Sequence, residues 1–340
     1  MSASQRNDSP ASPSQEASNR GALLHLRGDL AGAKRAYEEA LAIDPGNATA
    51  LNNLGYLYAQ EGRLDEAERL YNRAVELNPA SSTARANLGN VRALQGDVDG
   101  AVQHYREAVA IDPANIVAWD SLGRVLLAAG RPGEAEAVWK EAIAAVGGAD
   151  PKDLSLLYTG LGVAVAAQGR SDEAVRILQE AVAVDPESVE GWIQLGVALF
   201  ARKDFGSAEK ALKRALALDP DDVRARRRLS MVYAALGDVR AARTELERAH
   251  RINPADVDVR VDLAVLDLAE GRADQAWARL EGIEAAAGDS DRIRFYQGVA
   301  LDQLGRAEEA LERLRPLAQQ VFGKYAEEAQ KYLASRRAQG

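Results

Sequence analysis

The sequence predicts an all-α protein, a solenoid of nine helix-turn-helix repeats followed by a C-terminal capping helix. An alanine recurs every 34 residues along most of the chain, with a single interval of 39 residues. A glycine near the middle of the repeat and a proline near its end mark two short helices in most repeats. The recurrent alanines are Ala33, Ala67, Ala101, Ala135, Ala174, Ala208, Ala242, Ala276 and Ala310. Two-helix repeats of this length are typical of an α-solenoid.

Residues that start and end helices stand at fixed places in the repeat. Side chains that can accept hydrogen bonds from the first helical turn precede the first helix at Asn47, Ser81, Asn115, Ser188, Asp222, Asp256 and Ser290. In the fifth repeat, Asp153 is the nearest candidate. The first helix ends at Gly28, Gly62, Gly96, Gly130, Gly169, Gly237, Gly271 or Gly305, because glycine adopts the left-handed conformation easily. Lys203 takes this place in the sixth repeat, so we expect a strained or differently shaped turn there.

The apolar residues between these marks have the spacing of helix packing. A leucine followed by glycine recurs in the first helix, as in Leu54-Gly55, and the glycine lets the second helix approach closely. In the second helix, the recurrent alanine is followed four residues later by a large residue. These large residues are Tyr37, Tyr71, Tyr105, Trp139, Leu178, Leu212, Leu246, Leu280 and Leu314. Residues three or four apart share one helix face, so this pattern predicts the core between paired helices.

Two repeats carry a pattern that resembles the tetratricopeptide repeat signature. The matching residues are Trp119, Leu122, Gly123, Ala135, Trp139 and Ala142 in one repeat, and Leu51, Leu54, Gly55, Tyr58, Ala67, Tyr71, Ala74 and Pro79 in the other. The resemblance extends over all but the ends of the chain. It implies a right-handed superhelix whose first helices line a concave face. Since members of this family are mostly adaptors with unrelated partners, it says little about which partner is bound.

The repeat pattern divides the chain into three parts. Residues 1–13 are expected to be a disordered Ser/Pro-rich tail, residues 14–324 the repeat array, and residues 325–340 a capping helix and tail. In the capping helix, Tyr325, Ala329, Tyr332 and Leu333 share a face. Residues 147–151 form an insertion, which we interpret as a tolerated loop, with a hinge as the alternative.

Composition excludes several classes of function. The chain has 42 Lys+Arg and 51 Asp+Glu, a net charge of −9, so nucleic acid is not expected as a partner. Cysteine is absent, the three histidines are scattered, and no catalytic or phosphate-binding motif occurs. We therefore expect no enzyme activity, no metal and no cofactor. No apolar run is long enough to span a membrane, and the composition is compatible with the cytoplasm.

The candidate binding residues are those that the first helices would present to the concave face. They are polar in the second and third repeats (Asn52, Asn53, Tyr56, Asn87, Asn90) and apolar in the sixth to eighth (Ile193, Val197, Phe200, Met231, Val261, Val265). Arg224, Arg227 and Arg228 cluster in the seventh repeat, opposite Asp258 and Asp262 one repeat later. Two interpretations stay open for the asparagines, which either bind peptide backbone or face solvent. The arginines either bind acidic groups or form a solvated charge run.

These observations predict a non-catalytic scaffold that binds a peptide segment of a partner protein in the concave groove. Apolar residues would anchor the segment, and the three arginines would orient its acidic groups. One alternative is a structural module that forms homo-oligomers through its groove or its terminal repeats. Another is a regulatory subunit of a separate enzyme.

Overall fold

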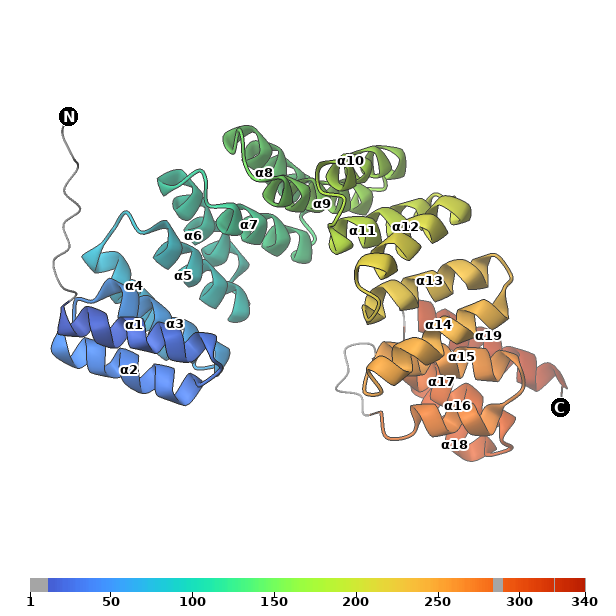
Figure 1. Cartoon of the computed structure of the whole chain (residues 1–340). Coiled ribbons are helices and arrows are strands. Elements are labelled where there is room, and N and C mark those ends of the chain that lie inside the picture. Colours follow the sequence, from blue (N-terminus) through green and yellow to red (C-terminus); the bar gives the residue numbers. More distant parts are fainter. Residues whose placement is uncertain (1–11, 284–289, 321, 340) are drawn as a thin grey trace. The chain divides into compact units, whose positions relative to one another are not determined.

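The computed structural model describes residues 12–283, 290–320 and 322–339 (Figure 1). In these residues it has 19 α-helices and no strand. The chain divides into two units, unit 1 (Met1–Pro186) and unit 2 (Glu187–Gly340). Most of the tail predicted at residues 1–13 lies outside the described residues, and the first helix already begins at Pro13.

Unit 1 contains five helix pairs in chain order. Their first helices are α1 (Pro13–Leu26), α3 (Ala48–Gln60), α5 (Ser82–Leu94), α7 (Ile116–Ala128) and α9 (Pro151–Ala167). Their second helices are α2 (Leu30–Ile43), α4 (Leu64–Leu77), α6 (Val98–Ile111), α8 (Pro132–Ala145) and α10 (Ser171–Val184). Each second helix packs on its own first helix, and α2, α4, α6 and α8 also pack on the first helix of the next pair in this unit.

Unit 2 repeats this arrangement and ends in an unpaired helix. Its first helices are α11 (Val189–Ala201), α13 (Val223–Ala235), α15 (Val257–Ala269) and α17 (Ser290–Gln303). Its second helices are α12 (Phe205–Leu218), α14 (Val239–Ile252), α16 (Ala273–Leu280) and α18 (Ala307–Ala318), and α19 (Lys324–Gln339) follows. First helices of neighbouring pairs also contact each other, as α3 and α5 do in unit 1 and α11 and α13 in unit 2. We call the surface that they form within each unit the first-helix face.

The predicted helix starts are largely confirmed. Side chains accept a hydrogen bond from the first turn of the following helix at Asn47, Ser81, Asn115, Ser188, Asp222 and Asp256. The side chain of Ser290 lies outside the described part of the structure. The prediction for Asp153 is wrong. The insertion adds a turn to the start of α9, so Asp150 caps this helix and Asp153 lies inside its first turn.

The turns between paired helices follow the glycine pattern. All eight predicted glycines have a left-handed backbone, with φ between 73° and 82°. Lys203 has φ 63°, the one positive φ of a non-glycine residue in the described part of the chain. The expectation of a strained turn is therefore confirmed, because Cβ crowds the backbone in this conformation.

Replacing Lys203 with glycine should raise the free energy of unfolding by about 1 kcal/mol, since the left-handed strain is relieved. Urea unfolding followed by circular dichroism measures this. The control introduces a Cβ at a left-handed glycine in another turn. Gly237 has φ 82° in the equivalent turn of the next pair, with open space around its Cα, so Gly237→Ala should cost a similar amount. An unchanged or lower stability of Lys203→Gly would contradict the strain.

The core lies between paired helices, where a large residue of the second helix covers a glycine of the first. A Cβ added at Gly55 would lie 2.8 Å from Cε1 of Tyr71, so any larger residue would push the helices apart. The insertion does not interrupt this packing. Val146 is buried in one cluster with Trp139 of α8 and Leu157 of α9. The boundary between the two units follows Pro186 rather than the insertion.

The last helix, α19, packs on α17 and α18. Ala329 is buried in the core of these helices, and Tyr325, Tyr332 and Leu333 pack against it. The hydroxyl of Tyr332 also donates to Oδ2 of Asp302 at 2.7 Å. The face predicted for the capping helix is thus the one that meets the last pair.

Candidate binding surface

The polar candidates of unit 1 form a hydrogen-bonded row on α3 and α5. Nδ2 of Asn87 donates to Oδ1 of Asn52 at 2.7 Å, and the hydroxyl of Tyr105 donates to Oδ1 of Asn90 at 2.6 Å. Burial raises the pKa of Tyr105 to about 12, so this hydroxyl keeps its proton and remains a donor at neutral pH. Asn87 and Asn90 therefore bond to Asn52 and to the core residue Tyr105.

Tyr56 is one of two exposed residues among these polar candidates, the other being Asn90. The side chain of Tyr56 is 44% exposed, and its ring lies 5.7 Å from that of His25 on α1. Nε2 of Gln60, one turn further along α3, donates to its hydroxyl at 3.0 Å. Tyr56 thus offers an aromatic surface on the first-helix face of unit 1.

The apolar candidates of unit 2 separate into two groups. Val197, Phe200, Met231 and Val265 are half-buried on the first-helix face. Ile193 and Val261 are only 3% and 1% exposed, so their assignment to an open groove is corrected. Ile193 packs against Ala215 and Ala225, and Val261 belongs to the core around α16 and α17. These two side chains support the surface from beneath.

Two of the three clustered arginines are already paired within unit 2. Arg224 contacts Glu190 at 2.8 Å and Asp222 at 2.9 Å. Arg227 contacts Asp258 at 2.5 Å and Asp262 at 2.6 Å, which confirms the predicted opposition of these charges. Arg224 and Arg227 thus already have carboxylate partners within the protein, and the role of the three arginines in orienting a partner's acidic groups stays a prediction.

These contacts form part of a charge ladder along the first helices α11, α13, α15 and α17. Glu190, Arg224, Asp258 and Arg292 are spaced by one repeat and alternate in sign. Arg292 contacts Asp258 at 3.2 Å and also pairs with Asp262, which places both aspartates between two arginines. The ladder links neighbouring first helices of unit 2 through ion pairs.

Replacing Asp262 with asparagine should lower the free energy of unfolding by about 1–3 kcal/mol, because Arg227 and Arg292 would lose a half-buried partner. Asp258→Asn is the matched control. The side chain of Asp258 is 53% exposed, against 17% for Asp262, so its loss should cost less than about 1 kcal/mol. Thermal unfolding of both variants measures the difference. Equal losses would show that burial does not decide the strength of these pairs.

Arg228 differs from its neighbours. Its side chain is exposed, and its one polar contact in the described part of the chain runs from a guanidinium nitrogen to Sδ of Met231, at 3.8 Å. Thioether sulfur is a weak acceptor, so the guanidinium charge is left without a counterion. Arg228 is therefore the member of the cluster that is suited to an external acidic group.

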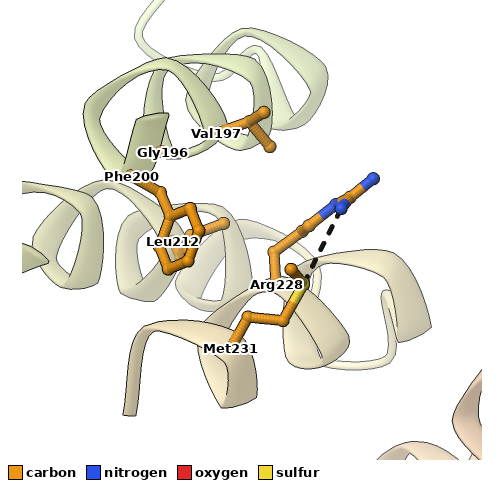
Figure 2. Close-up of a pocket in the computed structure, with 6 residues that line it drawn as sticks. All are labelled: Gly196, Val197, Phe200, Leu212, Arg228 and Met231. Atoms are coloured by element: carbon orange, nitrogen blue, oxygen red, sulfur yellow. Dashed lines mark hydrogen bonds between the residues drawn. The ribbon is translucent and has the colours of Figure 1, made fainter. Parts of the chain in front are cut away.

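A hollow of about 230 Å³ lies beside Arg228 (Figure 2). Its lining residues are Gly196, Val197, Phe200, Leu212, Arg228 and Met231, from α11, α12 and α13. The repeat pattern predicted only a core position for Leu212. One signal in the sequence could have revealed its second role. The large residue of the second helix changes from tyrosine or tryptophan in the first four repeats to the shorter leucine in the later ones.

The described residues lack two further kinds of site. They contain no group of three or more His, Asp or Glu side chains that could hold a metal ion. None of the described helices combines the length and the apolar character needed to cross a bilayer.

Paired helices, stacked in chain order, define a helical repeat protein. Tetratricopeptide repeat models match residues 24–89, 115–187, 165–227, 199–256, 233–294 and 292–316, and a further TPR repeat model matches residues 89–130. The chain belongs to the tetratricopeptide repeat family. No curated protein matches it. Family membership supports a protein–protein interaction scaffold.

Solved structures of low sequence identity share the fold. A chain of the APC/C hetero-tetramer Cut9-Hcn1 has a TM-score of 0.55 at 20% identity, over 81% of this chain and 52% of that one. A tetratricopeptide repeat protein from Parabacteroides merdae has a TM-score of 0.52 at 15% identity, over 85% and 98%. PilF of Pseudomonas aeruginosa has a TM-score of 0.51 at 19% identity, over 64% and 97%. This likeness concerns the fold alone.

Proposed function

We propose that this chain is a non-catalytic scaffold that binds an extended or helical peptide segment of a partner protein on its first-helix face. The observation that carries the proposal is the hollow in unit 2, where Val197, Phe200 and Met231 stay half-buried. When a partner covers apolar side chains that are packed on one side and open on the other, the burial of their surface stabilises the complex. Tyr56 offers a second contact of this kind in unit 1.

Random-peptide phage display on the full chain tests this function. Selected peptides should bind the purified protein, and substitution on the first-helix face should weaken them about tenfold or more. Two variants examine this face, Tyr56→Ser in unit 1 and the double substitution Val197→Ser/Met231→Ser in unit 2. The matched control is Val239→Ser/Ile252→Ser, two exposed apolar residues on the second helix α14.

The function is supported if either first-helix variant loses affinity and the control keeps it. Isothermal titration of one selected peptide against each protein gives the comparison. Failure to enrich any peptide, or an equal loss in the control, would contradict binding on the first-helix face.

A further inference from the structure

The hollow in unit 2 exists because a leucine replaces a tyrosine. In unit 1, Tyr105 of α6 extends to the first-helix face and donates to Asn90 of α5. Leu212 holds the equivalent place in α12 and packs on Gly196, where an added Cβ would lie 2.6 Å from its Cγ. A leucine has neither the ring nor the hydroxyl of tyrosine. Space therefore remains above it, between Val197 and Met231, which line the hollow from α11 and α13.

The size of the hollow limits what it can receive. Its empty space of about 230 Å³ includes open solvent, and only six residues line it, so it suits one side chain of a larger partner. Its lining is apolar apart from Arg228, which lies on one side of it in Figure 2. The side chain that it receives should therefore be apolar.

The unpaired charge of Arg228 defines the second part of the ligand. A guanidinium group binds a carboxylate through two parallel hydrogen bonds. A phosphate group carries more charge and usually requires several cations, but Arg224 and Arg227 are neutralised by Glu190, Asp222, Asp258 and Asp262. One free arginine therefore matches one carboxylate.

We infer that the hollow receives one apolar side chain of a partner peptide while Arg228 binds a carboxylate next to that side chain. This inference rests on the proposed function and names the chemistry of its ligand. The carboxylate belongs either to the C-terminus of the peptide or to an acidic residue beside the apolar one. Both sources present the same group to Arg228, and the experiment below distinguishes them.

Met231 provides a reporter inside the hollow. The sequence has 2 methionines, Met1 and Met231, so a full chain labelled with ¹³C at the methionine methyl groups gives a simple spectrum. Three synthetic probes are titrated. The first is Ser-Gly-Ser-Gly-Leu with a free C-terminus, the second is the same peptide with an amidated C-terminus, and the third is amidated Ser-Gly-Leu-Glu-Gly-Ser. All three are acetylated at the N-terminus.

In the wild-type protein, the methyl resonance of Met231 should shift with the first probe, the third probe or both. The second probe should need a concentration at least about tenfold higher to produce the same shift. A shift with the first alone assigns the carboxylate to a C-terminus. A shift with the third alone assigns it to an acidic side chain. Arg228→Gln should weaken the active probe about tenfold, whereas Arg124→Gln, a change of an exposed arginine on α7, should not.

Filling the hollow provides an independent variant. Leu212→Tyr introduces the residue that α2, α4 and α6 already carry at this place, and it should abolish the shift. Leu178→Tyr is the control, because Leu178 packs on Gly162 in the same manner but lies outside the hollow. Circular dichroism and thermal unfolding verify the fold of each variant. If Leu212→Tyr does not fold, Arg228→Gln still tests the inference, since it changes an exposed side chain.

The outcomes separate this inference from the proposed function. If display-selected peptides bind but leave the Met231 resonance in place, the function stands and the hollow is not the site. Equal binding of the second probe, or an unaffected Arg228→Gln variant, would overturn the role of the carboxylate. If neither these probes nor any displayed peptide binds, both proposals are wrong.

Discussion

Replacing Asp267 with asparagine should lower the free energy of unfolding by about 3–5 kcal/mol, because three arginines would lose a buried counterion. Asp267 lies on α15 and is fully buried. Its carboxylate is 2.8 Å from Arg243 of α14, 3.0 Å from Arg272 and 2.7 Å from Arg279 of α16. The side chain thus joins three successive helices. Urea unfolding at neutral pH measures the loss.

The same carboxylate should make stability depend on pH. Burial by itself would raise the pKa of Asp267, but hydrogen bonds from Arg279, Arg272 and Arg243 outweigh this and hold the pKa below its ordinary value. The unfolded chain has an aspartate pKa of about 3.9. Since the folded-state pKa lies lower, the stabilisation is fully present above the unfolded value and is lost as the pH falls through the folded value. The difference between wild type and Asp267→Asn should therefore shrink in acid.

An exposed aspartate provides the control for both measurements. Asp99 pairs with Arg131 at 2.9 Å, but its side chain is 90% exposed. Asp99→Asn should therefore change the stability by less than about 1 kcal/mol at any pH. A loss of similar size in the two variants would contradict the buried network, as would a difference for Asp267→Asn that stays constant down to pH 3.

Local features of the fold could be predicted from the sequence because each depends on one or two residues. Lys203 stands where other repeats have glycine, so its strained backbone follows from the chemistry of Cβ alone. Asn47 caps α3 for an equally local reason. The prediction that Asp153 caps the fifth repeat was wrong because the insertion lengthened α9. Repeat spacing does not indicate how an insertion is divided between loop and helix.

The site depends on contacts between repeats, and these were harder to predict. Ile193 and Val261 have the spacing of inward-facing residues, but packing by the next helices buries them. The buried role of Asp267 requires arginines from two other helices, whose orientation the sequence does not specify. The hollow arises because Leu212 lacks the ring and hydroxyl that Tyr105 has at the equivalent place. The sequence shows the smaller residue, but only the structure shows that the space above it stays open.

Replacing Trp139 with alanine should cost about 3–5 kcal/mol of unfolding free energy and so have an effect as large as that of Asp267→Asn. Trp139 is 1% exposed in α8 and is enclosed from two sides. Gly123 of α7 and Gly160 of α9 both lie so close to the indole that neither has room for a Cβ. Removal of the indole would leave a cavity between three helices, and the glycines have no side chains to fill it.

Two further variants test whether this fit explains the loss. Trp139→Tyr introduces the residue that α2, α4 and α6 carry at this place. It should therefore lower the free energy of unfolding by less than half as much as Trp139→Ala. Trp277→Ala removes a half-buried tryptophan that stacks with the guanidinium of Arg306 at 5.1 Å, and it should cost less than Trp139→Ala. Thermal unfolding of the three variants gives the order. If Trp277→Ala proved as costly as Trp139→Ala, the enclosure by two glycines would not be what makes Trp139 important, because none of the described glycines lies as close to Trp277.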